Sequence, residues 1–392
     1  MAKDIKLGID IGSSKIIAIL GYYNEDYKWD LVDFERIQSK GVLRGEIVDV
    51  NSVVRCLKVV LNSLKARGHE IPKETNICVG GQYTKNYKHV DFIRRNVGTE
   101  YTKQILDEIN EIAGSPVKNV NEEEYLKILR GICVDKDTME KDPYDKVGKK
   151  FAAHYNTVFG LSSSLNNIKS VLISCDLQLN NLLLKPEAIS EAVLLFNEKD
   201  EGVALIDIGA GTTSLIVYES GMLQQAAIIP FGGNTITSDI SKRFKLSLHE
   251  AELLKRKHGN AFAKYAEDEI VSVVLDERQH SINIKELSSV IQSRVEELLD
   301  AALYQIQKSE CKDKLEAGYV ITGGCASLVN IDKLLYAKDS KPVRLGYFDK
   351  DKIIGDRMNN LSFTTAIGTL AREENTKRSS SKLSKIWNSL FK

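Results

Sequence analysis

Two short segments far apart in the chain carry an aspartate, a glycine turn and small or hydroxyl side chains in the same order. The first reads LGIDIGSSK over residues 7–15 and the second reads LIDIGAGTT over residues 205–213. Glycine lets the backbone approach an anion and present N–H groups to it, and hydroxyls add further donors, so each hairpin is a predicted phosphate-binding loop. The candidate residues are Gly12, Ser13, Ser14 and Lys15 in the first hairpin, and Gly209, Ala210, Gly211, Thr212 and Thr213 in the second.

The aspartates of these segments, Asp10 and Asp207, are candidate supports for a metal ion. Mg²⁺ prefers carboxylate, water and phosphate oxygens, so we expect a hydrated Mg²⁺ held by both residues through water. One such hairpin alone is weak evidence, because many tight hairpins contain Asp and Gly. Two copies predict two similar lobes whose hairpins face each other across a nucleotide.

A third glycine turn follows later in the chain, where residues 319–327 read YVITGGCAS. A strand that ends at Gly323 and Gly324, just before Cys325, lets a flat base or ribose lie against bare backbone at a helix start. Taken alone, this segment is equally an ordinary strand-to-helix turn. In this order the three segments resemble the phosphate, phosphate and adenosine loops of the actin, hexokinase and heat-shock chaperone ATPase superfamily.

Within that superfamily the chain resembles the FtsA family of bacterial division proteins over most of its length. The matching strings are residues 39–49 (SKGVLRGEIVD), 229–240 (IPFGGNTITSDI), 251–255 with 258–259, and 364–368 (TTAIG). They look like the family's loop before its first long helix, its connecting segment, its nucleotide-side helix and its closing helix. The resemblance implies further nucleotide-site residues: Gly233, Asn234, Glu252 and Lys255.

The resemblance also implies an α/β, actin-like ATPase fold, with two ribonuclease-H-like lobes around a nucleotide cleft and an inserted subdomain in each lobe. Strand patterns that alternate with helical ones agree with this fold class. The expected divisions are residues 1–84 and 169–198 (first lobe), 85–168 (its inserted subdomain), 199–240 and 302–371 (second lobe), 241–301 (its inserted helical subdomain), 372–381 (flexible linker) and 382–392 (amphipathic membrane-targeting helix).

Composition agrees with a soluble protein of two lobes. A chain of 392 residues that is 43% hydrophobic and 28% charged can bury two cores. The formal net charge is +0, so we expect no nucleic-acid partner. The six cysteines form no C-x-x-C pair and are expected to be reduced core residues of a cytosolic protein. We also expect no signal peptide and no apolar run long enough to span a bilayer.

The expected partners follow from the resemblance. In this family the insertion at residues 85–168 contacts neighbouring protomers of a filament and downstream division proteins. The insertion at 241–301 receives the C-terminal tail of the tubulin-like protein FtsZ. Arg278 and Arg294 are candidate anchors for this acidic peptide, since a guanidinium forms paired hydrogen bonds with a carboxylate. For each arginine, a solvated helix face is the simpler alternative.

One position departs from the superfamily pattern. Hydrolysing members carry Glu or Gln before a proline at a strand end, where it orients the attacking water. Here residues 184–190 read LKPEAIS, so Lys185 occupies that position, and a charged lysine cannot accept a proton from water. Glu187 or Glu191 would need a shifted geometry to replace it. The sequence therefore predicts ATP binding that gates polymerisation, with slow or negligible turnover.

The last residues form a predicted membrane anchor. The polar stretch 372–381 is typical of a flexible tether. After it, apolar residues fall on one helical face with lysines around them, which is typical of a helix lying in the interface of an anionic membrane. The residues of this face are Leu383, Ile386, Trp387, Leu390 and Phe391. The alternative is a helix that packs back on the body.

Two classes of function are compatible with these features. The leading one is an ATP-binding, actin-like filament former that tethers the FtsZ ring to the cytoplasmic face of the cell membrane at the division septum. The alternative is an enzyme of the same superfamily, a small-molecule kinase or chaperone-type ATPase, or a relative of the pilus-assembly ATPases. A kinase should offer an aspartate base in a substrate cleft, and a chaperone should continue into a substrate-binding domain. The predicted tether and lipid-binding helix favour the first class.

Overall fold

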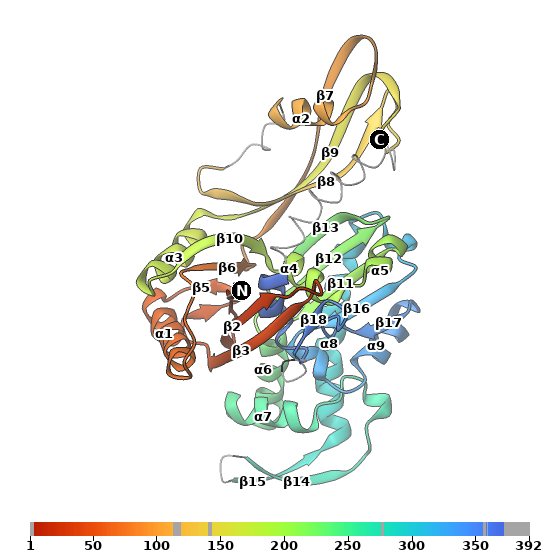
Figure 1. Ribbon diagram of the computed structural model, residues 1–392. Helices are drawn as coiled ribbons and strands as arrows, with labels where there is room; N and C mark the ends of the chain where they lie inside the picture. The colour runs from red at the N-terminus through yellow and green to blue at the C-terminus, as the bar shows by residue number, and fades with distance from the viewer. Residues whose placement is uncertain are drawn as a thin grey trace.

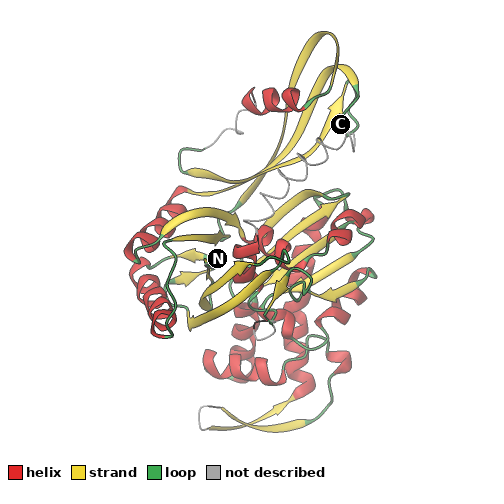
Figure 2. Cartoon of the chain, in the orientation of Figure 1, coloured by secondary structure: helices red, strands yellow, loops and turns green. Residues whose placement is uncertain are grey.

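The computed structural model describes residues 4–112, 119–139, 143–275, 278–355, 358 and 360–371. Within these residues, two mixed sheets with adjoining helices form the body of the molecule (Figures 1 and 2). The first sheet has the order β10-β6-β1-β2-β3-β18 and the second the order β13-β12-β11-β16-β17. The first is built from β1 (Lys6–Ile11), β2 (Lys15–Tyr23), β3 (Trp29–Gln38), β6 (Glu74–Val79), β10 (Gln178–Leu184) and β18 (Ile353–Ile354). The second is built from β11 (Val203–Ile208), β12 (Thr213–Glu219), β13 (Met222–Ile229), β16 (Gly318–Thr322) and β17 (Val343–Leu345).

The two sheets repeat one topology. In the first, β1, β2 and β3 are antiparallel neighbours, and β6 and then β10 add in parallel on the other side of β1. In the second, β11, β12 and β13 are antiparallel, and β16 and then β17 add in parallel beside β11. The β1–β2 turn and the β11–β12 turn therefore occupy equivalent places in two similar lobes.

Continuous apolar runs place these strands inside the molecule. Residues 16–20 and 203–206 are fully buried, as expected of strands covered on both faces. Helix α1 (Val50–Ala66) packs on β2 and β3 and against α3 (Ser162–Ser174), while α8 (Ile284–Gln307) packs on β12 and β13. Helix α4 (Lys185–Val193) contacts strands of both sheets, and the first lobe's apolar core continues onto residues of the second sheet. The lobes are thus joined by a common core.

The first insertion is a sheet of order β7-β9-β8 that stands above the body (Figure 1). It is made of β7 (Lys85–Glu100), β8 (Glu122–Val134), β9 (Val147–Leu161) and helix α2 (Lys103–Ile112). It has its own core, in which Tyr101, Ile109 and Phe151 are buried. Because α3 already begins at residue 162 and packs on α1, this sheet ends before the expected boundary at residue 168.

The second insertion contains more than helices. After α6 (Gly233–Phe244) come α7 (Leu248–His258) and η1 (Ala263–Tyr265), and then a hairpin of β14 (Ile270–Leu275) and β15 (Arg278–Asn283). The inserted subdomain that was expected to be helical therefore also includes strands. The run of β-branched residues in β14 is the signal for them, because such residues fit a pleated strand. Helix α8 continues without a break through the expected boundary at residue 301.

The remaining elements are short. They are β4 (Val42–Leu43), β5 (Glu46–Ile47), α5 (Phe196–Glu201), η2 (Lys312–Lys314), η3 (Gly324–Ser327) and α9 (Ile331–Asp339). Residues 364–371 are also helical. In the part of the chain that the structure describes, no helix combines the length and the apolar character needed to cross a membrane.

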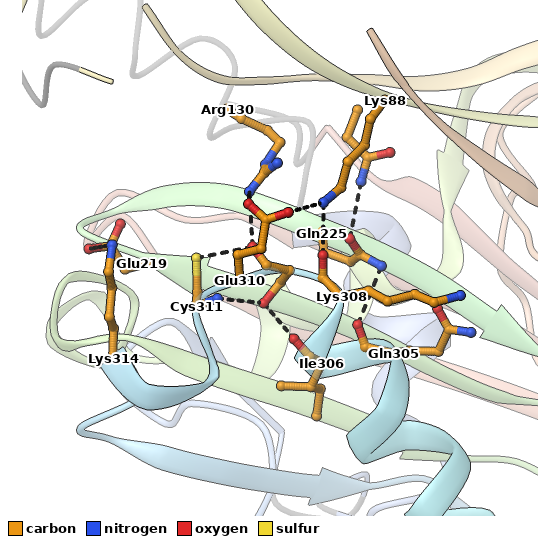
Figure 3. Close-up of polar contacts among 12 residues, drawn as sticks. Lys88, Arg130, Glu219, Gln225, Gln305, Ile306, Lys308, Glu310, Cys311 and Lys314 are labelled. Carbon is orange, nitrogen blue, oxygen red and sulfur yellow. Dashed lines mark hydrogen bonds and ion pairs between the residues drawn. The ribbon is translucent and has the colours of Figure 1, made fainter. Parts of the chain in front are cut away.

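The first insertion docks on the second lobe at the turn that ends α8 (Figure 3). Lys88 on β7 donates to the Lys308 carbonyl and to a Glu310 carboxylate oxygen, both at 2.8 Å. Arg130 on β8 donates to the Ser309 carbonyl at 2.9 Å. The last carbonyls of a helix have no partner within it, so these two cations satisfy acceptors that the end of α8 leaves open.

Arg130→Ala should loosen this docking. The Arg130 side chain is 7% exposed, and a hydrogen bond from a charged group is worth about 1.5–3 kcal/mol, so the free energy of opening the insertion should fall by about that amount. Lys88→Ala is the matched control: its side chain is 42% exposed, and an exposed pair is worth about 0–1 kcal/mol. Hydrogen exchange of β7, β8 and β9 measures both. Equal effects from the two variants would contradict a special role for Arg130.

Candidate nucleotide-binding site

The two predicted phosphate hairpins have the same backbone geometry. In the first, the Gly12 N–H donates to the Lys15 carbonyl at 3.0 Å, and in the second the Gly209 N–H donates to the Thr212 carbonyl at 2.9 Å. Each bond closes a tight turn directly after the strand that carries the aspartate. Other amides of each turn remain at its tip, which is the arrangement that binds phosphate oxygens.

The two hairpins approach each other across the two lobes. A Cβ atom placed on Gly211 would lie 2.4 Å from the Ser13 hydroxyl, so only glycine allows this approach. The Ser13 hydroxyl accepts a hydrogen bond from the Gly45 N–H at 2.9 Å. The loop at residues 39–49 therefore belongs to the site, as a support for the first hairpin.

Helix α6 begins against the second hairpin. The Gly233 N–H donates to the Gly209 carbonyl at 2.9 Å, and the Asn234 N–H donates to the Ala210 carbonyl at 2.8 Å. The Cys325 sulfur lies 3.7 Å from the same Gly209 carbonyl. Residues from three distant parts of the sequence thus converge on one turn, and all of them were predicted to belong to the site.

The third glycine turn presents an open backbone surface. Gly323 has a φ of 89°, and a Cβ atom on it would lie 2.4 Å from a carboxylate oxygen of Asp207, so this position requires glycine. Gly324 is exposed, and no described atom lies within 4 Å of the place its Cβ would take. This is bare backbone facing open space next to the buried aspartate, which suits a flat base or ribose.

Helix α7 contributes a lysine that holds the start of helix α6. The Lys255 ammonium donates to the Gly233 carbonyl at 3.0 Å and to the Thr237 hydroxyl at 2.7 Å, and it pairs with Glu252 at 2.6 Å. Burial acts to raise the pKa of Glu252, but Lys255, Thr237 and Arg256 together hold it below its usual value. In this structure Lys255 and Glu252 fix the start of α6, which in turn holds the second hairpin.

The hydroxyl residues of the hairpins differ in their roles. Thr213 is fully buried, and its hydroxyl donates to the Phe231 carbonyl at 2.9 Å. Thr212 is also buried, whereas Ser13 and Ser14 are half-buried. The hydroxyls of the first hairpin are thus the more accessible ones, and Thr213 acts through the backbone of its turn.

A lysine pairs with one of the two aspartates at the floor of the site. Asp10 and Asp207 are 8% and 2% exposed, and the Lys185 ammonium lies 2.8 Å from Asp207 Oδ2. The same oxygen accepts a hydrogen bond from Ser214 at 3.1 Å. Burial acts to lower the pKa of Lys185, but Asp207 and Asp10 outweigh it and raise that pKa above its usual value. For Asp10, burial raises the pKa, while Lys185 and Lys15 act in the opposite direction.

This pairing decides how a metal ion could be held. Carboxylates are the donors that Mg²⁺ prefers. One oxygen of Asp207, however, is already paired with the Lys185 ammonium. Among the described residues, no group of three or more His, Cys, Asp or Glu side chains could hold a metal ion. The residues present therefore fit a hydrated ion that Asp10 and Asp207 reach through water, and not one that they enclose directly.

Sequence reasoning identified Lys185 but not its partner. The string LKP showed that a lysine replaces the expected Glu or Gln, yet the ion pair joins the start of α4 in one lobe to the end of β11 in the other. No local pattern reports such a contact. The identical placement of Asp10 and Asp207 in equivalent hairpins is the signal that could have suggested a cation between them.

Lys15 gives the site a pH dependence. Its burial, with smaller contributions from neighbouring cations, lowers the pKa of Lys15 to about 8. A bound phosphate would favour the charged form, so nucleotide affinity should be constant below pH 8 and fall by up to about tenfold per pH unit above it. Lys15→Arg, which keeps its charge, should flatten this profile. Calorimetric titration of ATP between pH 7 and pH 9 measures it, and a wild-type profile that rises above pH 8 would contradict the role of Lys15.

The candidate peptide anchors are not brought together as a free pair. Arg294 on α8 donates to Asp239 at 2.6 Å and to Glu297 at 2.5 Å, so its guanidinium is already engaged within the protein. Arg278 begins β15, and its side chain is not described. The residues of the predicted membrane face lie outside the described part of the chain. These are Leu383, Ile386, Trp387, Leu390 and Phe391.

The repeated sheet topology defines an actin-like fold, and the converging hairpins lie where its two lobes meet. Several solved structures share the fold. The PilM-PilN type IV pilus biogenesis complex matches with a TM-score of 0.61 at 15% identity, covering 94% of this chain and 98% of that chain. MreB 5 of Spiroplasma citri bound to AMPPNP matches with a TM-score of 0.59 at 14% identity, covering 97% and 99%. The MamK double helical filament matches with a TM-score of 0.53 at 11% identity, covering 94% and 98%.

Sequence comparison narrows the class. A family model described as cell division protein FtsA matches residues 204–368. The FtsA of Neisseria meningitidis serogroup B is 29% identical over 92% of this chain and 88% of its own length. The FtsA of Escherichia coli K12 is 26% identical over 94% and 90%, and that of Bacillus subtilis 26% identical over 84% and 76%. Over most of its length the chain is thus similar to cell division protein FtsA of several bacteria. The expected resemblance to FtsA and the expected actin-like α/β fold are both confirmed, and the kinase, chaperone and pilus alternatives are not favoured.

Proposed function

We propose that this chain binds ATP between its two lobes and assembles into filaments that tether the FtsZ ring to the cytoplasmic face of the cell membrane at the division septum. The observation that carries the nucleotide part is the convergence of two equivalent hairpins, the Gly323–Gly324 turn and the start of α6 around the buried Asp10 and Asp207. A solved protein of the same fold has AMPPNP bound, which supports a nucleotide as the ligand.

Each part of the site has a proposed task. Amides at the tips of the hairpins, with the Ser13 and Ser14 hydroxyls and Lys15, hold the phosphates. The open face at Gly324 receives the base and ribose. Mg²⁺ accompanies the phosphates and is supported through water by the two aspartates, where it neutralises phosphate charge.

Turnover is proposed to be slow or negligible. Lys185 stands where a water-orienting Glu or Gln is expected, and its ammonium is committed to Asp207 at 2.8 Å. A charged ammonium donates hydrogen bonds and accepts none, so it cannot position water as an acceptor for its proton. ATP would then act as a ligand that holds the two lobes together, and filament assembly would depend on its binding.

The partner surfaces are proposed from the resemblance to FtsA. The sheet of order β7-β9-β8 projects from the body, where it can contact a neighbouring protomer or downstream division proteins (Figure 1). A solved actin-like relative in fold, MamK, is a double helical filament. The second insertion, residues 241–301, is the proposed site for the FtsZ tail. Because Arg294 is engaged by Asp239, an acidic tail would have to compete with that carboxylate.

Membrane attachment is proposed for residues 382–392, from their sequence alone. Five large apolar side chains on one helical face, with lysines beside them, suit the interface of an anionic bilayer. A single short helix binds weakly, so a filament that presents many of them gains avidity. Polymerisation and attachment would then reinforce each other.

Co-sedimentation with anionic liposomes tests the whole proposal. We expect ATP to increase the pelleted fraction, and a peptide of the FtsZ C-terminal tail to pellet with the protein. A chain ending at residue 381 should stay in the supernatant while still binding ATP. Pelleting that is indifferent both to ATP and to residues 382–392 would contradict the proposal, and a tail peptide that never pellets with the protein would remove FtsZ as the partner.

A further inference from the structure

The floor of the phosphate site contains a protein cation where this fold is expected to place a metal. Lys185 is the first residue of α4 in the first lobe, and its ammonium crosses to Asp207 in the second lobe at 2.8 Å. The lysine and aspartate side chains are only 16% and 3% exposed. This is a buried ion pair between the lobes, at the base of both hairpins.

Two glycines lie close to the Lys185 side chain. A Cβ atom on Gly80 would lie 3.1 Å from the Lys185 Cβ, and one on Gly209 would lie 3.3 Å from its ammonium nitrogen. Larger residues at either position would press on the lysine. Because neither glycine has a side chain, Lys185 can extend from α4 to the turn of the second hairpin.

The two aspartates at this floor already have protein cations beside them. The Lys185 ammonium pairs with Asp207, and both Lys185 and Lys15 act electrostatically on Asp10, lowering a pKa that burial raises. A divalent ion placed between the aspartates would lie beside an ammonium that already neutralises one of them. An ammonium has three N–H donors, and the ion pair with Asp207 uses one, so others can donate to phosphate oxygens.

We propose that Lys185 is the resident cation of the phosphate site, so that this chain binds ATP without needing a divalent metal. The inference rests on the proposed ATP site and specifies its charge chemistry. Mg²⁺ on the nucleotide is then tolerated but dispensable. The same ion pair ties the lobes together, while the remaining N–H groups of the ammonium donate to the bound phosphates.

Calorimetric titration of ATP into the full-length chain, once with EDTA and once with Mg²⁺, tests this directly. The wild type should bind ATP in both, with affinities that agree within about threefold, a difference of ~0.6 kcal/mol. Lys185→Gln removes the charge and keeps the reach of the side chain. Its affinity in EDTA should fall by about tenfold or more, and Mg²⁺ should restore most of the loss.

Lys199→Gln is the matched control. Lys199 on α5 is a comparable lysine, 14% exposed and paired with Glu191 at 3.0 Å, but it forms no ion pair with the hairpins' aspartates. It should leave both affinities unchanged, which separates loss of a cation in the site from loss of any buried ion pair.

The outcomes distinguish the inference from the proposed function beneath it. A wild type that binds ATP with Mg²⁺ and loses it in EDTA overturns the inference and leaves the ATP site standing. This comparison needs no variant, so it holds even where Lys185→Gln folds poorly. A Lys185→Gln protein that binds as tightly as the wild type in EDTA also overturns it. A wild type that binds no ATP in either condition overturns the proposed function itself.

Discussion

Gly324→Leu should strongly weaken nucleotide binding and leave the fold unchanged. Gly324 does not have a positive φ, and no described atom lies within 4 Å of the place its Cβ would take, so leucine fits without strain. The added side chain fills the open face that is proposed to receive the base. We expect ATP affinity to fall by about a hundredfold, or ~2.7 kcal/mol.

Calorimetry and thermal unfolding together measure this prediction. A surface substitution away from packing features usually changes stability by about 0.5 kcal/mol or less, so the melting temperature should stay near that of the wild type. Ser327→Leu adds the same side chain at an exposed position of the same turn and is the control. A Gly324→Leu protein that binds ATP normally would show that the base lies elsewhere.

Trp387→Glu should release the protein from membranes. The predicted anchor places Trp387 in the middle of its apolar face, so the new carboxylate must either pull the helix out of the acyl boundary or enter hydrocarbon at a cost of about 2.5 kcal/mol or more. Attachment by one short helix is marginal, so a loss of this size should detach monomers and weaken filaments. Nucleotide binding should not change, because the body is untouched.

Ser389→Glu controls for the added charge. It introduces the same carboxylate on the polar side of the predicted helix, where it should weaken liposome binding far less than Trp387→Glu. Deletion of residues 382–392 should reproduce the Trp387→Glu result. A Trp387→Glu protein that pellets like the wild type would rule out the anchor, and loss of ATP binding in the same variant would mean that the helix packs on the body.

The sequence revealed those parts of the site whose signal is local. A glycine turn after an apolar strand can be recognised in any sequence, and its repetition around Asp10 and Asp207 predicts two equivalent lobes. The double glycine at 323–324 predicts a third turn in the same way. In the structure these segments converge, because β1 and β11 hold equivalent places in sheets of one topology.

Contacts between distant segments could not be predicted from the sequence. Lys255 was expected at the nucleotide from family resemblance, but in the structure its ammonium binds oxygens of α6 and pairs with Glu252. The Lys185–Asp207 pair joins two lobes, and its existence depends on how the whole chain folds. Hydrophobic periodicity and turn chemistry describe neighbours in sequence, so they report neither contact.

The hairpin of β14 and β15 was missed for another reason. The surrounding segment is dominated by the helical periodicity of α8. The prediction of a helical subdomain therefore included the short β-branched run at 270–275. The first insertion gave only a loosened pattern, because β7 alternates between exposed and half-buried residues along most of its length. A strand with one solvent-exposed face and few apolar residues shows only a weak hydrophobic alternation in its sequence.

The central claim is that ATP binds between the two hairpins and the Gly323–Gly324 turn. Hydrogen exchange of the full-length wild type, compared with and without saturating ATP, tests it most directly. The account predicts that ATP slows exchange together in residues 11–15, 208–213 and 323–327, which lie far apart in sequence and converge in the fold. Protection that is absent from these segments at an ATP concentration shown by calorimetry to saturate the protein would contradict it.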